Sequence, residues 1–306
     1  MEQTVNSPAA MKSQLTSLLT NEVLSRVERM RLNPTRRLTN RSRGEHLTGK
    51  GGTSTEFSDY RNYVAGDDVR YVDWNIFSRL NKPYVRLYQH EEEMHVVVLV
   101  DASSSMMFEG KLDRAKQLAA SFGIMGLMNV ERVSVYSCNH VGKTPVLMPP
   151  STGRPKIKRL LEFLETLEGG GNISVEQAIE SVLRLHRGRG VVVVLSDFLT
   201  FGSVERSFNM LYSAGLEIFG VQVLGPTEID PEVTGDLRFV DSETGGTLDI
   251  SSAGDLLGLY HEHRLGLEQY LAQECRKRSG RFVSLNSGDP LDWVLFDLFR
   301  RRGWVQ

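Results

Sequence analysis

Two aspartates in this 306-residue chain stand at the ends of strongly apolar stretches, and serines accompany both. Asp101 is followed at alternating positions by Ser103 and Ser105, and Asp197 comes directly after Ser196. A carboxylate and two hydroxyls, with no sulfur or imidazole nearby, are hard oxygen donors that suit Mg²⁺ or Mn²⁺ better than zinc. Two carboxylates at neighbouring strand ends would also repel each other without a cation. The sequence therefore predicts a divalent-cation site whose ligands are Asp101, Ser103 and Ser105, with the Asp197 carboxylate acting through water or from behind these ligands.

A simpler interpretation of the first motif is the start of a helix. Asp and Ser are preferred N-cap residues, because their side-chain oxygens accept the free backbone N–H groups of the first turn. Asp101 and its serines precede an apolar pattern with helical spacing over residues 111–128, so this motif alone is compatible with either role. The second acidic strand end, at Asp197, favours the cation site.

The elements that must position these residues are strands that alternate with helices. Strands that are apolar on both faces are typical of a mostly parallel sheet covered on both sides. The expected strands are residues 96–100, 133–137, 146–148, 191–195 and 216–223, and the expected helices are residues 111–128, 156–167, 175–186 and 204–214. The predicted fold class is therefore α/β, with a doubly wound, mostly parallel sheet that binds ligands at the carboxyl ends of its strands.

The chain is expected to contain four segments. Residues 1–35 carry an amphipathic helix from residue 15 to about residue 32, and residues 36–93 form a β-rich segment with many glycines, aromatic side chains and charges of both signs. Residues 94–225 form the α/β domain. Residues 226–306 form an extension packed on that domain: a hairpin at 237–250, a helix at 253–278, a strand at 282–285 that could join the sheet edge, and a helix at 291–302.

The composition excludes several classes of protein. Lys and Arg number 36 and Asp and Glu 38, so the net charge of −2 argues against a dedicated binder of nucleic acid or anionic membranes. No apolar run approaches the roughly 20 residues that cross a bilayer, and residues 1–10 do not resemble a secretory signal. Two cysteines, Cys138 and Cys275, are too few for a disulfide framework or a metal cluster. We expect a cytoplasmic protein with two buried thiols and no membrane span.

The strand-end residues resemble a known metal site. Asp101-Ala102-Ser103-Ser104-Ser105, with Asp197 in Val-Leu-Ser-Asp-Phe, is similar to the metal-ion-dependent adhesion site (MIDAS) of von Willebrand factor A domains. The resemblance implies a cation held by the first Asp, both serines, a threonine from another loop and the second Asp. It also implies one open coordination position for an acidic side chain of a partner.

A second resemblance lies upstream. The segment from Glu56 to Trp74, with Asp59-Tyr60-Arg61 and Gly66-Asp67-Asp68, and the later segment from Gly235 to Gly245 resemble the bacterial domain of unknown function 58 (DUF 58) family. The likeness covers about residues 36–300. The charged residues of this segment could form turns and ion pairs that brace the aromatic side chains, or a surface for a partner; they are Asp67, Asp68, Asp73, Arg61, Arg70 and Arg79.

The third MIDAS motif departs from the family pattern. The resemblance implies a threonine in a glycine-rich loop before a helix, and here that position falls on Ile173 in Gly169-Gly170-Gly171-Asn172-Ile173-Ser174. Asn172 and Ser174 are possible substitutes. The loss of one oxygen ligand is expected to weaken cation binding.

Other motifs do not support catalysis. Residues 48–53 lack the spacing of a phosphate-binding loop, and Ser105 lacks both a nucleophile elbow and a histidine placed by the sequence to activate it. His261 and His263 stand two apart in an expected helix, so they point about 200° apart and cannot hold one ion from that helix.

The expected function is that of a non-enzymatic adaptor whose Mg²⁺ or Mn²⁺ accepts an acidic residue of a partner. The family resemblance implies work with a MoxR-type AAA+ ATPase, or with its substrate, in the chaperone-like maturation of complexes. Two alternatives stay open: a metal-dependent hydrolase or phosphotransferase that uses Asp101, and a metal-free scaffold, which the Ile173 departure leaves open.

Overall fold

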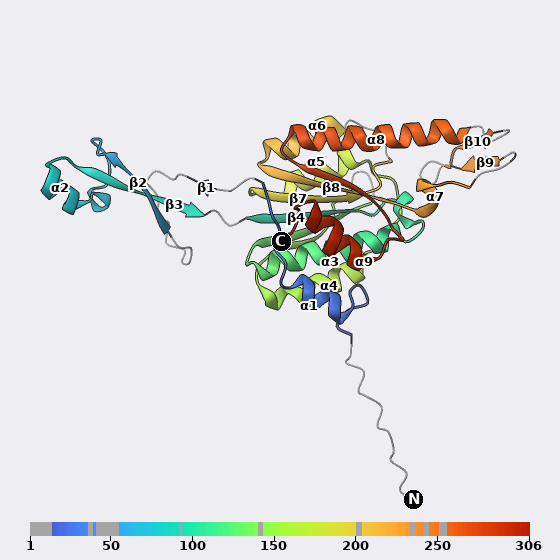
Figure 1. The fold of residues 1–306 in the computed structure, drawn as a ribbon, viewed down its shortest axis with the longest axis horizontal. Helices are drawn as coiled ribbons and strands as arrows, with labels where there is room; N and C mark the ends of the chain where they lie inside the picture. The colour runs from blue at the N-terminus through green and yellow to red at the C-terminus, as the bar shows by residue number, and fades with distance from the viewer. Residues whose placement is uncertain are drawn as a thin grey trace, which may run out of the picture. The chain divides into compact units, whose positions relative to one another are not determined.

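The computed structural model describes residues 14–35, 39–40, 55–91, 94–139, 143–199, 204–232, 235, 237–240, 245–250 and 256–306. The chain forms two compact units, of which the larger comprises Met1–Thr35 with His95–Gln306 and the smaller comprises Arg36–Met94 (Figure 1). The smaller unit is therefore inserted between the N-terminal segment and the first strand of the larger unit.

The central sheet of the larger unit has six strands in the order β11-β8-β7-β4-β5-β6, all parallel except the pair β5 and β6. The strands are β4 (His95–Asp101), β5 (Arg132–Cys138), β6 (Val146–Ser151), β7 (Gly190–Ser196), β8 (Leu216–Leu224) and β11 (Arg281–Asn286). Along the chain, the sheet is built outward from β4 through β5 to β6 on one side, and then from β7 through β8 to β11 on the other side. The strand order thus reverses between β4 and β7, and the predicted doubly wound α/β sheet is confirmed.

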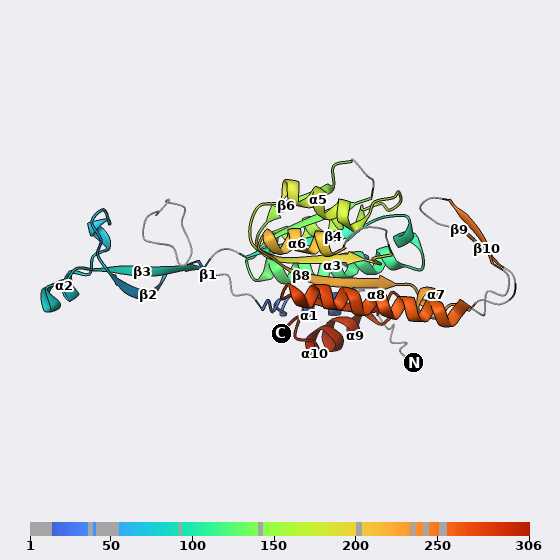
Figure 2. The ribbon, with the colours of Figure 1, turned by 90° about the horizontal axis from the view of Figure 1, so that it is seen from above.

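Helices cover both faces of the sheet (Figures 1 and 2), because its inner strands are apolar on both. Alternate residues of β4, Val97 and Leu99, join one hydrophobic cluster with Ala178, Leu211 and Leu271 from the helices of the first face. These helices are α5 (Val175–Leu185), α6 (Val204–Ser213) and α8 (Leu257–Lys277). The opposite face is covered by α3 (Lys111–Met128), with α1 (Asn21–Val27) and α4 (Ile157–Glu165) packed beside it.

The C-terminal residues close the core under that second face. Trp304 is 1% exposed, and its ring centroid lies 5.2 Å from that of Phe299 and 4.8 Å from that of Phe219. The helical segment predicted at 291–302 is present, but it contains an unexpected π turn. It consists of α9 (Leu291–Trp293), the π turn (Val294–Leu298) and α10 (Phe299–Arg301).

The N-terminal helix is shorter than the apolar spacing predicts. α1 begins after Thr20, whose hydroxyl accepts a hydrogen bond from the backbone N–H of Val23, and the preceding residues are not helical. Glu165 holds this non-helical part, since its Oε1 accepts a hydrogen bond of 2.5 Å from the Thr16 hydroxyl. After the helix, Arg31 exchanges two backbone hydrogen bonds with Gln306. Packing of both flanks against the larger unit thus overrides the helical periodicity.

The extension after β8 follows most of the predicted elements. The short helix α7 (Pro226–Ile229) comes first, and β9 (Leu237–Val240) pairs antiparallel with β10 (Thr247–Ile250), which confirms the hairpin. The strand predicted at 282–285 joins the sheet edge as β11, parallel to β8. The helix expected from residue 253 is present as α8, which begins at Leu257 after its N-cap Leu256, and residues 251–255 lie outside the described part of the chain. None of the helices described here has the length and apolar character that a bilayer span requires.

The smaller unit has a three-stranded antiparallel sheet of order β1-β3-β2. Its elements are β1 (Thr39–Asn40), β2 (Thr55–Asn62), a 3₁₀ turn (Val69–Tyr71), α2 (Trp74–Leu80) and β3 (Tyr84–Glu91). Its charged residues form ion pairs within the unit: Arg61 with Asp67, Arg70 with Asp68, and Arg86 with Asp73. Asp73 also caps α2 through the N–H groups of Asn75 and Ile76. These contacts support the turn and ion-pair interpretation, although Trp74 is 59% exposed.

Removal of the Trp304 side chain is expected to destabilise the larger unit strongly. The substitution Trp304→Ala leaves a large void among Phe122, Phe219 and Phe299, which corresponds to a loss of about 3–5 kcal/mol in the free energy of unfolding. Trp293→Ala is the matched control, because Trp293 is 45% exposed. Urea unfolding measures both, and equal losses in the two variants would contradict the packing described.

His186 makes the stability dependent on pH. Burial lowers the pKa of His186 below its usual range, and the neighbouring ring of His95 and charge of Arg187 lower it further. The unfolded chain therefore takes up a proton on His186 at a higher pH than the folded chain does, so stability is lost as the pH falls below about 6.5. Urea unfolding at about pH 7.5 and about pH 5.5 should show a smaller difference for His186→Gln than for the exposed control His263→Gln. A pH dependence unchanged in His186→Gln would contradict this.

Candidate functional site

The two predicted aspartates meet at the point where the strand order reverses. Asp101 is the last residue of β4, Asp197 follows the last residue of β7, and these two strands are direct neighbours, with Val100 opposite Leu195. In open α/β sheets this crevice is the usual ligand position. The expected proximity of the two acidic strand ends is therefore found in the structure.

The Asp101 carboxylate is buried and held by neutral donors. Its Oδ1 accepts a 3.0 Å hydrogen bond from the backbone N–H of Ser103, and its Oδ2 accepts a 2.6 Å hydrogen bond from the hydroxyl of Ser196. Burial, and to a lesser extent the charge of Asp197, raises the pKa of Asp101 to about 6. The carboxylate thus carries a negative charge that these contacts compensate only in part.

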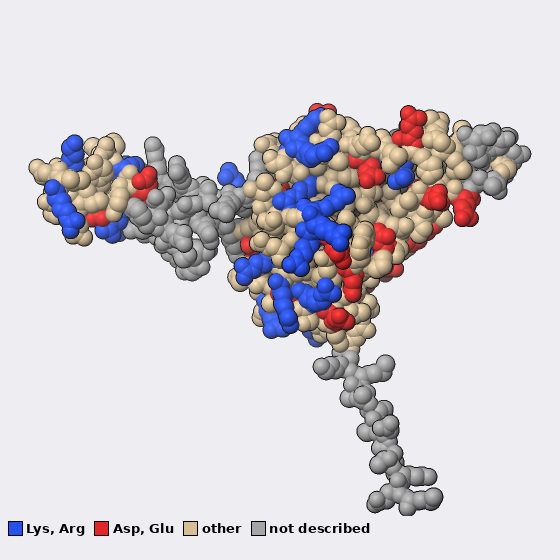
Figure 3. All heavy atoms as spheres, in the orientation of Figure 1, with Lys and Arg blue, Asp and Glu red and all other residues tan. Residues whose placement is uncertain are grey.

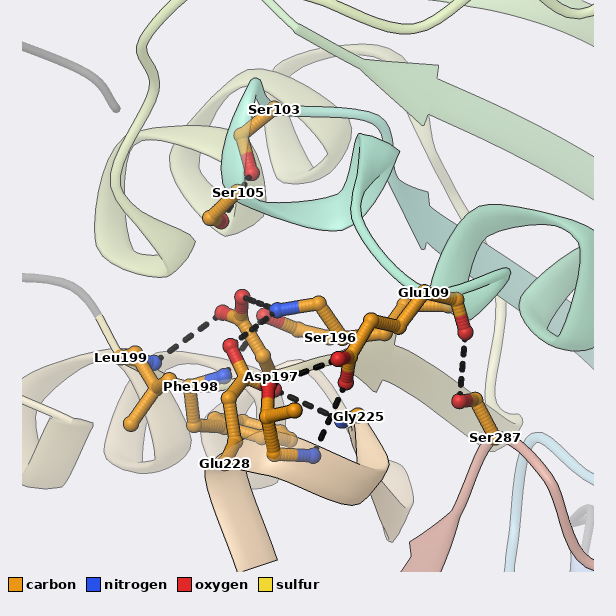
Figure 4. A network of polar contacts seen from close by, with 12 residues as sticks. Ser103, Ser105, Glu109, Ser196, Asp197, Phe198, Leu199, Gly225, Glu228 and Ser287 are labelled. Carbon is orange, nitrogen blue, oxygen red and sulfur yellow. Dashed lines mark hydrogen bonds and ion pairs between the residues drawn. The ribbon is translucent and has the colours of Figure 1, made fainter. Parts of the chain in front are cut away.

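The two predicted serine ligands lie on the loop after Asp101, where their hydroxyl oxygens are 3.1 Å apart (Figure 4). The glycine-rich loop braces this turn: the N–H of Ser104 donates to Gly171 O, the N–H of Gly171 donates to the Ser104 hydroxyl, and the N–H of Gly170 donates to Ala102 O. Gly171 has a φ of 94°, a conformation that other residues rarely adopt. Gly171 thus permits the backbone conformation that lets this loop hydrogen-bond to the serine turn.

The third motif contributes less than the first two. Ile173 is 3% exposed and belongs to the hydrophobic cluster under α5, so it offers no oxygen. The Ser174 hydroxyl caps α5 by accepting a hydrogen bond from the N–H of Gln177. Asn172 is exposed on the same loop. Of the two proposed substitutes for threonine, Ser174 thus has a helix-capping role. That Asn172 is a cation ligand stays a prediction.

A buried ammonium group, which the sequence analysis missed, neutralises the second aspartate. Lys111 Nζ donates to Asp197 Oδ2 at 2.9 Å and to Glu228 Oε1 at 2.6 Å, and the side chains of Lys111 and Asp197 are both fully buried. Burial disfavours the charged form, but the two carboxylates outweigh it and raise the pKa of Lys111. The other Asp197 oxygen accepts a hydrogen bond from the backbone N–H of Leu199 (Figure 4).

One sequence signal could have revealed Lys111. It is the first residue of α3, and the helix macrodipole disfavours a cation at that end. A lysine there, ten positions after a strand-end aspartate, indicates a specific anionic partner. Glu228 gives no comparable signal, because its position in the first turn of α7 is an ordinary one for a glutamate.

The same stretch of chain ties the C-terminal extension to the site. Glu109 accepts hydrogen bonds from the hydroxyl and N–H of Thr227 at the start of α7, and its backbone oxygen accepts one from the Ser287 hydroxyl (Figure 4). The Arg114 guanidinium donates to the backbone oxygens of Ser287 and Asp289. The segments that follow β8 and β11 thus hold the stretch between Asp101 and α3 in place.

The remaining sequence candidates lie elsewhere. His261 and His263 project from α8, and residues 48–53 lie outside the described part of the chain. Within the residues that the structure describes, no group of three or more His, Cys, Asp and Glu side chains is arranged to hold a metal ion. A cation at the strand ends would therefore depend on hydroxyl and water oxygens as well as on carboxylates.

Comparison with known families identifies the chain. The family model described as "Protein of unknown function DUF58" matches residues 59–260. The chain belongs to the DUF58 family. It is 28% identical over 273 residues to the uncharacterized protein Rv1480 of Mycobacterium tuberculosis and to its counterpart Mb1516 of Mycobacterium bovis, covering 85% of this chain and 84% of each relative.

Solved structures resemble this DUF58 chain more remotely. The conserved hypothetical protein BatB of Bacteroides thetaiotaomicron is 16% identical, with a TM-score of 0.39 over 63% of this chain and 90% of that one. Proximal thread matrix protein 1 of the mussel byssus, solved with a zinc-occupied MIDAS motif, is 15% identical, with a TM-score of 0.33 over 43% of this chain and 38% of that one.

The donor chemistry of the DUF58 site fits a hard cation, with two departures. Asp101, Ser103 and Ser105 present oxygen donors from one loop, as Mg²⁺ and Mn²⁺ prefer. Ile173 adds no oxygen, and the Lys111 ammonium already compensates Asp197. The fit to a hard cation is therefore limited to the oxygens of Asp101, Ser103 and Ser105.

Loss of the Lys111 charge is expected to destabilise the fold. Lys111→Met leaves the buried Asp197 carboxylate without a counter-charge, which corresponds to a loss of about 3–5 kcal/mol in the free energy of unfolding. The double variant Lys111→Met/Asp197→Asn should recover part of this loss, because the coupled partner is removed as well. Lys158→Met, at a 75% exposed lysine, is the control. A change below about 1 kcal/mol in Lys111→Met, measured by urea unfolding, would contradict a stabilising role for this ion pair.

Proposed function

We propose that this DUF58 protein is a non-catalytic interaction domain of the von Willebrand factor A type, whose strand-end site binds an acidic side chain of a partner through Mg²⁺ or Mn²⁺. The observation that carries the proposal is that the two aspartates have different partners. Asp197 is paired with Lys111, whereas the contacts described for Asp101 are hydrogen bonds from the N–H of Ser103 and the hydroxyl of Ser196. One carboxylate at the switch point is therefore left for an added cation.

Each residue of the site has a distinct part in this proposal. Asp101, Ser103 and Ser105 hold the ion, and Ser196 orients the carboxylate by its hydrogen bond to Oδ2. When bound, the ion supplies positive charge and an open coordination position for a partner carboxylate. Lys111 keeps Asp197 from competing for that charge, and Asp197 then contributes through water.

The departure at Ile173 sets the expected affinity. With no oxygen from that residue, water must complete the coordination, and each lost protein ligand weakens binding. We expect weak binding, at millimolar rather than micromolar ion concentrations.

The partner follows from the family resemblance. We propose a MoxR-type AAA+ ATPase or its substrate, in the cytoplasm, with this chain as an adaptor in the maturation of complexes. The proposed ion would take an acidic contact residue of that partner at its open coordination position.

The hydrolase alternative is less well supported. A metal-dependent hydrolase or phosphotransferase that uses Asp101 needs a positioned general base or a second acidic cluster in the same loops, and the neighbouring Asp197 and Glu228 are paired with Lys111. A metal-free scaffold stays the alternative if no cation binds.

Calorimetry tests the cation site. Mg²⁺ and Mn²⁺ should give measurable binding to the wild-type protein, and Asp101→Asn should weaken it at least about tenfold, because the ligand charge is lost. Asp113→Asn is the matched control, since Asp113 is exposed on α3. Equal binding in Asp101→Asn, or no heat from either ion at millimolar concentration, would contradict the proposal.

The partner itself is tested by a binding assay with a purified MoxR-type ATPase from the source organism. Binding should require Mg²⁺ or Mn²⁺, should be lost in EDTA, and should fall in the double variant Ser103→Ala/Ser105→Ala, which removes two ligands while leaving Asp101 in place. Binding that persists in EDTA would contradict a cation-bridged contact.

A further inference from the structure

An apolar groove lies in the C-terminal extension, next to the strand-end site. It encloses about 1150 Å³ and is formed by α7 with the residues after it, by the first half of α8, and by Asn286 at the end of β11. This volume exceeds that of a typical small-molecule pocket, about 300–1000 Å³, and can accommodate several side chains of a polypeptide segment. Glu228 belongs both to the groove wall and to the Lys111 ion pair.

One wall of the groove is an apolar face of α8 and the residue before it, joined to α7 by the hydrogen bond that the Tyr260 hydroxyl donates to the backbone oxygen of Glu228. Leu256, Leu259, Tyr260 and His263 follow the spacing i, i+3, i+4, i+7, which places them on one side of a helix. Leu259 is 52% exposed. The buried residues of α8 begin only at Leu271, so its first half projects beyond the core that holds its second half. Pro226 and Ile229 of α7 face the same space.

The groove has an acidic rim. Glu228, Asp230 and Glu232 are among the described residues that line it, and this lining contains neither Lys nor Arg. Asp230 and Glu232 are exposed. On the larger unit, Figure 3 shows most of the Lys and Arg side chains of this face gathered in a band away from the end that carries α7 and the start of α8, with a further basic group lying apart from the band. An occupant of this groove must therefore match apolar walls and negative edges together.

We infer that the groove binds an amphipathic helical segment of a partner protein, with an apolar stripe flanked by Lys or Arg. Apolar side chains of the segment would cover Leu259 and Tyr260, and its cations would pair with Asp230 and Glu232. The inference rests on the proposed function only in assuming that the chain is an interaction domain. The groove would be a second contact site beside the cation site. It prefers a partner segment with positive charges, whereas the proposed cation site prefers an acidic side chain.

Two synthetic peptides provide the probe. Each is a fluorescein-labelled helical peptide of about 18 residues with a leucine stripe, flanked by Lys in one and by Glu in the other. Fluorescence anisotropy with the full-length protein should show the Lys peptide binding at least about tenfold more tightly than the Glu peptide, and added NaCl should reduce the difference. Equal affinity for the two peptides, or no binding of either, would overturn the inference.

Matched variants locate the binding. Leu259→Asn should weaken binding of the Lys peptide about tenfold, whereas Leu265→Asn should leave it unchanged. Leu265 is similarly exposed on α8 but lies about 180° from Leu256 around the helix. Glu232→Lys should reduce the preference for the Lys peptide, and Glu22→Lys, outside the groove on α1, should leave it unchanged. If Leu259→Asn binds like the wild type, or if both glutamate variants act alike, the groove is not the site.

The assay also separates this inference from the proposed cation site. All peptide measurements are repeated with EDTA and with Asp101→Asn, and the Lys peptide should bind equally in both conditions because the groove residues need no ion. Failure of the cation site then leaves peptide binding intact, and failure of the groove leaves the Mg²⁺ heats intact. A concentration-dependent dimer that Leu259→Asn abolishes, with no peptide binding, would assign the groove to a second copy of this chain and overturn the inference.

Discussion

The ion pair between the buried Lys111 ammonium and Asp197 is the interaction on which the arrangement of the strand ends depends. The parallel sheet brings β4 and β7 together, so Asp101 and Asp197 must share a buried crevice where like charges repel. Lys111 neutralises one of the two carboxylates, Asp197, and also forms an ion pair with Glu228 on α7. The same ammonium that stabilises the crevice thus attaches the C-terminal extension to it.

The extension is held by contacts that continue from this ion pair. Glu109 and Arg114, on either side of Lys111 in the chain, bind the starts of the segments that follow β8 and β11. At the other end of the extension, Trp304 fills the core beneath the sheet. The extension is therefore part of the larger unit, and among the described residues its groove between α7 and α8 keeps exposed apolar side chains such as Leu259.

Much of the fold could be predicted from the sequence because the strands are apolar on both faces. Few structures other than a sheet covered on both sides require such strands. The residues at 96–100 and 191–195 mark both the sheet and the position of the acidic ends. The length of α1 could not be predicted, since Glu165 and Gln306, distant in sequence, hold its flanks. Lys111 was missed for a related reason: its partners stand 86 and 117 positions away, and only the unusual place of a lysine at a helix start hints at them.

The net charge of the chain does not describe the strand-end crevice, because positive and negative side chains are distributed unevenly. Burial and the macrodipole of α3 both oppose an ammonium at Lys111, and the attraction of two carboxylates in a medium of low dielectric constant outweighs them. Three carboxylates and one ammonium still leave an excess of negative charge at the crevice, and the hydrogen-bond donors described for Asp101 are neutral. Under the proposed function this excess favours a metal ion at Asp101, since burial strengthens the electrostatic contacts made there.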